Sequence, residues 1–134
     1  MLRWLRQTAF SQRNRQPPIR AIVGRPHESL ANQVEHELLE KYTPDGYSIA
    51  IKQVIEQTKP DLLLLPHTYQ VRDYAPKLAA SLGKGMVADC IGYKTEGGKL
   101  LFVRQMFQGK TAADVSLQGA APWFVSFQAG AFRA

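Results

Sequence analysis

Leu62-Leu63-Leu64-Leu65-Pro66 is the stretch of this sequence that most directly predicts the fold. The four leucines form a short apolar run, and the prolines on either side, Pro60 and Pro66, cannot continue a helix. A short, wholly apolar run between turn residues is typical of a strand buried on both faces, which occurs in parallel sheets covered by helices. We therefore predict an α/β domain built around this strand.

Helical patterns lie on both sides of the leucine run. Apolar residues at helical spacing predict a helix over Tyr47–Gln57 and a second over Asp73–Leu82, with Pro76 in its first turn and Gly83 as its C-cap. Weaker helical patterns cover Leu2–Phe10 and either residues 28–33 or the longer range Glu28–Tyr42.

The remaining apolar runs predict strands. Ile19–Val23 is β-branched and ends at a glycine, and the last third of the chain is rich in strand patterns around a Gly97-Gly98 turn. The order of elements predicts a three-layer α/β sandwich with a mostly parallel sheet and an antiparallel, strand-rich end. The strands expected in that end are Met86–Tyr93, Leu100–Phe107 and Trp123–Phe127.

Composition and charge narrow the class of protein. With 134 residues, 45% hydrophobic and 21% charged, residues 1–134 fit one globular domain, and no apolar run is long enough to span a membrane. The net charge of +6 comes from six arginines among residues 1–25, a segment without acidic residues, whereas the remaining residues are electroneutral. No nucleic-acid module accompanies that segment, so we expect an exposed basic face or a contact with an acidic partner there.

Motifs for phosphate, dinucleotide or metal binding are incomplete. Gly109-Lys110-Thr111 resembles the end of a P-loop, but Arg104 occupies the position of the required first glycine. There is no G-x-G-x-x-G motif, and the histidines show no metal-ligand spacing. His67 and Ser81 have no evident triad partner, and Cys90 lies in an apolar run that indicates a buried, inert thiol. We therefore expect neither a metal site nor a catalytic constellation.

The loop after the leucine run is the candidate site for a ligand or a partner. It follows the carboxyl end of a predicted parallel strand, which is where α/β sheets place their ligands. Arg72 could bind an anion or an acidic side chain, while the alternative is that Asp73 only caps a helix beside a solvated Arg72. The candidate residues are His67, Thr68, Arg72 and Asp73.

Several short stretches, taken together and in order, resemble the alpha subunit of electron transfer flavoproteins. The Arg72-Asp73 pair followed by Pro76-Lys77-Leu78-Ala79-Ala80 is one such motif. The other stretches are residues 41–47, 59–68, 86–90, Arg104 with 107–112, and 129–132. The motif residues that we single out are Pro76, Asp89, Arg104, Gly109 and Lys110.

This resemblance implies an adenine-nucleotide-hydrolase-like fold, the amino-terminal domain of an alpha subunit. Such a subunit pairs with a beta subunit, and FAD, held chiefly by a carboxyl-terminal domain, carries electrons from acyl-CoA or similar dehydrogenases. The chain ends at Ala134, before that domain, so we expect no FAD ligand and no bound FAD in this chain alone. The resemblance also implies a cytoplasmic protein of bacterial type rather than one of the mitochondrial matrix.

The amino end departs from the family pattern. Leu2–Phe10 aligns with the family's first helix and Ile19–Val23 with its second strand, so the first family strand is expected to be missing. Uncovered backbone and apolar groups would then favour association with a beta subunit or with a second copy of this chain. The resemblance also implies an alternative to a single helix over Glu28–Tyr42, namely a short strand near Val34–Glu37. Two other functions stay open: a stand-alone adenine-nucleotide-binding module similar to universal stress proteins, and an enzyme of the same fold.

Overall fold

The computed structural model describes residues 19–25, 28–34 and 39–132, which form two helices and a seven-stranded sheet. Neither of these helices is long and apolar enough to cross a membrane. The elements are, in chain order, β1 (Ile19–Arg25), β2 (Glu28–Val34), α1 (Pro44–Thr58), β3 (Leu62–Pro66), α2 (Tyr69–Ser81), β4 (Met86–Glu96), β5 (Lys99–Met106), β6 (Thr111–Val115) and β7 (Trp123–Phe127).

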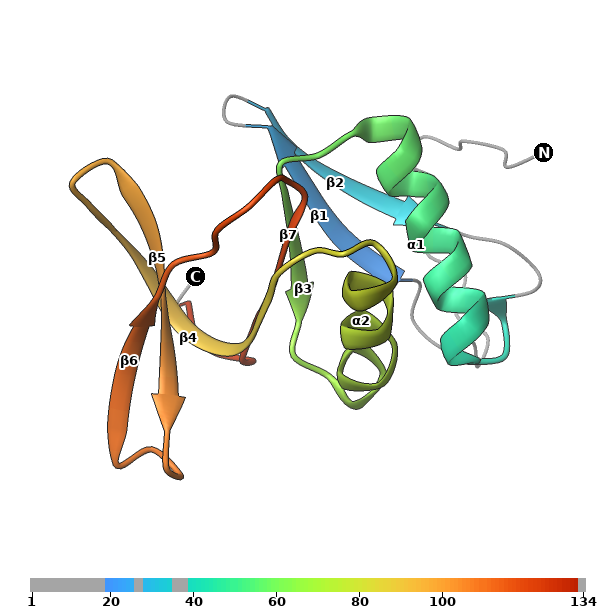
Figure 1. The fold of residues 1–134 in the computed structure, drawn as a ribbon. Helices are drawn as coiled ribbons and strands as arrows, with labels where there is room; N and C mark the ends of the chain where they lie inside the picture. Colours follow the sequence, from blue (N-terminus) through green and yellow to red (C-terminus); the bar gives the residue numbers. More distant parts are fainter. Residues whose placement is uncertain (1–18, 26–27, 35–38, 133–134) are drawn as a thin grey trace.

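The sheet is mixed, and its order is β2-β1-β3-β7-β4-β5-β6 (Figure 1). The last strand in sequence, β7, lies between β3 and β4 and runs parallel to both. The pairs β1–β2, β1–β3, β4–β5 and β5–β6 are antiparallel. The parallel part is thus confined to β3, β7 and β4, which is less than the mostly parallel sheet we predicted.

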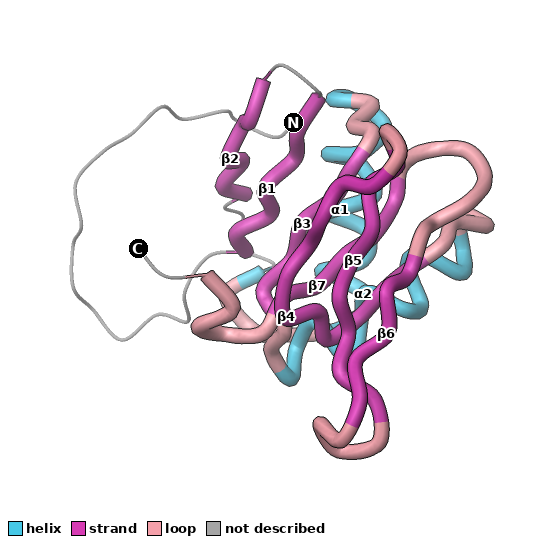
Figure 2. The backbone as a smooth tube through the Cα atoms, turned by 90° about the vertical axis from the view of Figure 1, so that its left-hand side faces the viewer, coloured by secondary structure: helices cyan, strands magenta, loops and turns pink. Residues whose placement is uncertain are grey.

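Both helices pack on one face of the sheet (Figures 1 and 2). Leu63, Leu65 and Phe124 point toward the helices and join a core with buried residues of α1 and α2. Val125 belongs to a second cluster, which also holds Phe102 and partly buried leucines of β3. Alternate residues of β3 and β7 therefore contribute to different clusters, as the pleat of a strand requires.

The α/β class and the antiparallel, strand-rich end are confirmed, and the sheet with the helices on one of its faces forms two layers of the predicted three-layer sandwich. The strands expected at 62–65, 86–93, 100–107 and 123–127 are present, as is the helix at 47–57, each within a residue or a few at its ends. The helix expected over 2–10 lies outside the described residues.

The predicted helix over residues 28–33 or Glu28–Tyr42 is wrong. The structure has a strand, β2, whose residues pair with β1 in a continuous register from Arg25↔Glu28 to Ile19↔Val34. The ladder hydrogen bonds to β1 outweigh a weak amphipathic pattern, since helix propensity differs by less than about 1 kcal/mol among ordinary residues.

The second helix begins earlier than its apolar pattern indicates. Thr68 is the N-cap of α2, and its Oγ1 accepts a hydrogen bond from the backbone N–H of Val71 at 3.2 Å. Asp73 is consequently not a cap, and Pro76 lies inside the helix rather than in its first turn. The helix ends one residue earlier than predicted: Leu82, not Gly83, is the C-cap, and Gly83 follows with a φ of 63°, a left-handed conformation that glycine adopts without strain.

Candidate functional site

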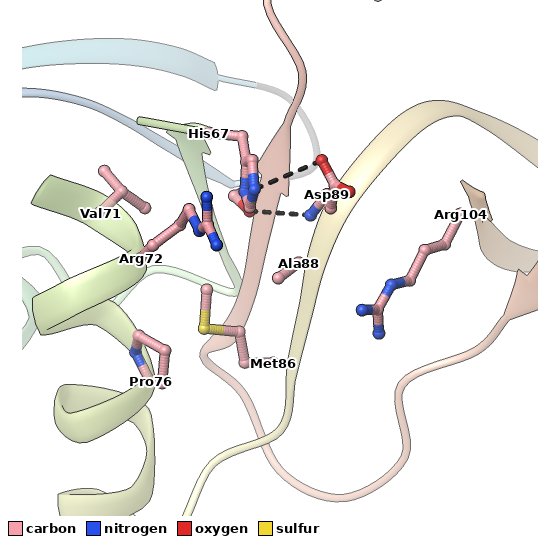
Figure 3. A pocket seen from close by; sticks show the side chains of 9 residues that line it. His67, Val71, Arg72, Pro76, Met86, Ala88, Asp89 and Arg104 are labelled. Atoms are coloured by element: carbon pink, nitrogen blue, oxygen red, sulfur yellow. Dashed lines mark hydrogen bonds and ion pairs between the residues drawn. The ribbon is translucent and has the colours of Figure 1, made fainter. Parts of the chain in front are cut away.

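A pocket of about 470 Å³ opens where α2 faces β4 and β5 (Figure 3). Arg72 and Pro76, four residues apart on one side of α2, form one wall of this pocket. Met86 and Ala88, two residues apart on one face of β4, form another wall. Its position near the carboxyl ends of the parallel strands is the position at which α/β sheets bind ligands.

His67 stands at the end of the leucine strand. Its backbone N–H donates to the carbonyl of Phe127 at 2.7 Å, so β3 and β7 stay paired one residue beyond Pro66. Its ring Nδ1 lies 2.9 Å from Oγ of Ser126, a β7 residue. The end of the leucine strand therefore directs the imidazole toward β7 and β4.

Asp89 interrupts β4 in the same region. Its φ of 65° is left-handed, a conformation that Asp tolerates better than most residues, and the pairing of β4 with β7 shifts register here. Its backbone N–H donates to Ser126 Oγ at 3.1 Å. Its carboxylate Oδ1 accepts from Gln128 Nε2 at 2.9 Å and lies 3.3 Å from His67 Nε2. The polar contacts thus tie the ends of three strands together.

Ser126, His67 and Asp89 form a linked chain that corrects our expectation of a histidine without triad partners. With the ring hydrogen on Nε2, each member is satisfied: the Ser126 hydroxyl donates to Nδ1, and Nε2–H faces the Asp89 carboxylate. The Ser126 side chain, however, is 0% exposed, and its Oγ also accepts the Asp89 N–H. These contacts join the ends of β3, β7 and β4, and Ser126 also belongs to the lining of the pocket.

Two guanidinium groups point into the pocket from opposite sides (Figure 3). Arg72 comes from α2 and Arg104 from β5, and these are the two arginines whose side chains the structure describes. Within the described residues, neither guanidinium has a carboxylate partner, and Arg72 makes only a cation–π contact, 5.8 Å from the centroid of the Tyr69 ring. Both groups are therefore free to bind an anion.

Cys90 is buried and belongs to the second apolar cluster, not to the core that includes the helices. Burial raises the pKa of its thiol from 9.0 to about 11, and the nearby Arg104 charge offsets only part of that rise. The thiol is accordingly protonated at neutral pH, as a buried, inert cysteine should be. No three side chains of the kinds that ligate metals gather anywhere in the described part of the chain.

The structure brings together His67, Arg72, Pro76, Asp89 and Arg104, all of which line the pocket. The other predicted residues lie outside its lining. Thr68 caps α2, and Asp73 accepts a hydrogen bond from the Tyr42 hydroxyl at 2.7 Å. Gly109 and Lys110 lie in the turn between β5 and β6.

The comparison with protein families decides the wider relationship. A model of the electron transfer flavoprotein domain matches residues 31–134. The chain belongs to the electron transfer flavoprotein family. The resemblance based on short motifs is thereby confirmed, whereas the proposed alignment of Leu2–Phe10 and Ile19–Val23 precedes the matched range and stays a prediction.

Curated members of the electron transfer flavoprotein family share about a third of their matched residues with this chain. The alpha subunit of Bacillus subtilis (strain 168) is 35% identical over 103 residues, which cover 69% of this chain and 32% of the relative. The alpha subunit of Thermoanaerobacterium thermosaccharolyticum is 34% identical over 101 residues, 75% of this chain and 31% of the relative. Protein FixB of Azotobacter vinelandii is 34% identical over 93 residues, which cover 66% of this chain and 26% of the relative.

This family member therefore spans about a third of the length of the relatives that it matches. The relatives support an alpha-type electron transfer flavoprotein domain. The alternative of a stand-alone module similar to universal stress proteins finds no support in these comparisons.

Sequence reasoning missed Ser126 and Gln128. Ser126 is the single polar residue within the apolar run Trp123–Phe127, and a polar group inside a buried strand needs a partner. That interruption was the available signal. Its partners could not be read from the sequence, because His67 and Asp89 lie 59 and 37 positions away.

Proposed function

We propose that this chain acts as the alpha-subunit domain of an electron transfer flavoprotein, a non-catalytic domain in an assembly that carries electrons. The observation that carries the proposal is the family match over residues 31–134, together with 35% identity to the Bacillus subtilis alpha subunit. The contacts of Ser126, which is buried, with His67 and Asp89 are in keeping with a supporting role, because they join strand ends.

The residues of the pocket do not fit a complete FAD. An isoalloxazine ring is large, planar and mostly apolar, and flat sites for such rings use aromatic or extended apolar walls. Among the described residues no Phe, Tyr or Trp lines the pocket, whose volume is about 470 Å³, toward the lower end of the range of ligand sites. We accordingly propose that FAD is held by other parts of the assembly, a carboxyl-terminal domain and a beta subunit.

The partners follow from the same proposal. A beta subunit would associate with this domain, and acyl-CoA or similar dehydrogenases would donate electrons to the assembly. Association with a second copy of this chain is the other possibility for covering its exposed apolar surface, which includes Phe107 at 75% exposure. The relatives named above are bacterial, which supports a cytoplasmic location in a bacterium.

The test is flavin binding by the purified chain, first alone and then with a beta subunit. We expect no stoichiometric flavin absorbance for the chain in excess FAD after gel filtration. With a beta subunit of the family, we expect a complex that elutes earlier, and the light-scattering mass should equal the sum of the two subunits. The matched control is the beta subunit with FAD alone.

Two outcomes would contradict this proposal. Stoichiometric flavin on the isolated chain would show that the cofactor is held here. A chain that stays monomeric at micromolar concentration, with and without a beta subunit, would remove the role in an assembly.

A further inference from the structure

We propose that the pocket between α2, β4 and β5 binds a small organic phosphate monoester, with Arg72 and Arg104 holding the phosphate. This site goes beyond the electron-transfer role and does not depend on flavin or on a beta subunit. The starting observation is that two guanidiniums, 32 positions apart in the sequence, face one pocket of about 470 Å³. The volume suits a ligand of mononucleotide size or smaller.

The charges that line the pocket favour the binding of an anion. Two like charges directed into one space repel each other, and a bound anion removes that repulsion. Among the described residues the pocket lining has one carboxylate, that of Asp89, whose Oδ1 accepts a hydrogen bond from Gln128 and lies 3.3 Å from His67 Nε2. Figure 3 shows this carboxylate directed to His67, away from both guanidiniums. Neither arginine forms an ion pair with this carboxylate.

The donor set favours phosphate over a carboxylate. Each guanidinium presents a planar fork of N–H donors, and two forks offer more donors than the two oxygens of one carboxylate use. A phosphate monoester carries a charge of about −1.5 to −2 near pH 7 and three acceptor oxygens, which matches two cations. An acidic side chain of a partner would match only one of them.

The rest of the pocket suits the organic part of such a ligand. Four apolar residues, Val71, Pro76, Met86 and Ala88, line the same pocket. Contact with these groups would favour a sugar or a small ring over free phosphate, because burial of apolar area adds to the affinity. We therefore expect an organic phosphate to bind more tightly than inorganic phosphate.

The test is isothermal titration calorimetry of the full chain at low salt with four probes: inorganic phosphate, ribose 5-phosphate, AMP and adenosine. We expect saturable binding of the two esters, weaker binding of inorganic phosphate and none of adenosine. Arg72→Gln and Arg104→Gln should each weaken ester binding at least about tenfold, which is the loss of one charge-assisted hydrogen-bonding partner. Arg104→Lys should restore part of it, since the charge returns without the fork.

The matched control is Lys52→Gln, which removes one exposed positive charge on α1, outside the pocket lining, and should leave ester binding unchanged within about twofold. Circular dichroism and the melting temperature without ligand should be alike for all variants, because both arginines are exposed.

Three results would overturn the proposal. The first is no binding of either ester, and the second is equal binding by wild type and both arginine variants. The third is that neither ester binds and both arginine variants no longer associate with a beta subunit. In that case the arginines bind an acidic side chain of the partner instead of a phosphate. If neither ester binds while the chain alone binds no flavin and forms a complex with a beta subunit, this phosphate site is wrong and the proposed function is still supported.

Discussion

At the scale of single residues, one buried hydroxyl organises the candidate site. Ser126 Oγ lies within hydrogen-bond distance of both the Asp89 backbone N–H and the His67 ring. It therefore supports the left-handed backbone of Asp89 and the orientation of the imidazole at once. A second serine offers the opposite case: the Oγ of Ser48, on α1, is buried and has no partner among the described residues.

Replacing these two serines should have opposite effects. Ser126→Ala leaves the Asp89 N–H and the His67 nitrogen without a partner, so we expect the free energy of unfolding to fall by about 1–3 kcal/mol. Ser48→Ala removes an unsatisfied polar atom and adds a better helix former, so stability should stay the same or rise. Urea unfolding followed by circular dichroism measures both changes. A Ser126→Ala variant as stable as wild type would mean that the network has no structural role.

At the scale of elements, the start of α2 shows how a cap can outweigh an apolar pattern. The sequence indicates Asp73 as the candidate cap, because the apolar spacing predicts a helix that begins there. The structure uses Thr68, because a helix that begins at Tyr69 follows directly from the end of β3 at Pro66. Asp73 instead contacts Tyr42, 31 positions earlier in the sequence, a contact that no local pattern announces.

Stability measurements can distinguish the capping role of Thr68 from the contact of Asp73 with Tyr42. Thr68→Ala removes the acceptor for the Val71 N–H and should lower the free energy of unfolding by about 1 kcal/mol. Asp73→Ala should lower it only while the Tyr42 hydroxyl is present, so the same change in a Tyr42→Phe background should have little further effect. An equal loss in both backgrounds would mean that Asp73 stabilises the helix rather than the contact with Tyr42.

At the scale of the whole molecule, groups buried on both faces of the sheet link stability to alkaline pH. Burial raises the pKa of Cys90, in the second cluster, to about 11. On the helix side, burial raises the pKa of Tyr42 to about 12, with a smaller contribution from the hydrogen bond to Asp73. Burial also raises the pKa of Tyr74 above the usual range for tyrosine. The folded state therefore holds these protons at a pH at which an unfolded chain releases them.

The sign of the pH effect follows directly. Above about pH 9 the unfolded state binds fewer protons at Cys90 than the folded state, so the free energy of unfolding should fall as pH rises from 9.0 toward about 11. The tyrosines should add to this fall above about pH 10. Urea titrations between about pH 8 and about pH 10.5 measure the profile. Cys90→Ala should delay the onset of the fall, and an unchanged profile in that variant would assign it to the tyrosines alone.

Local patterns determined the elements of this protein with a strong, continuous signal. The leucine strand, the helix over Tyr47–Gln57, the strands at 86–93 and 123–127, and the burial of Cys90 follow from runs and spacings within about a dozen residues. The family, too, followed from short motifs in order, and five of the residues singled out in advance line one pocket. Such features depend on local hydrophobicity and backbone preference, which can be predicted from neighbouring residues in the sequence.

Only the tertiary structure decided what depends on contacts between distant segments. The strand β2 replaced an expected helix because β1 was available to pair with it, and β7, last in sequence, entered the centre of the sheet between β3 and β4. The Ser126–His67–Asp89 chain and the facing of Arg72 and Arg104 arise from that insertion and from the packing of α2. Strand pairing and side-chain convergence are set by free energies shared between remote segments, so no window of sequence contains them.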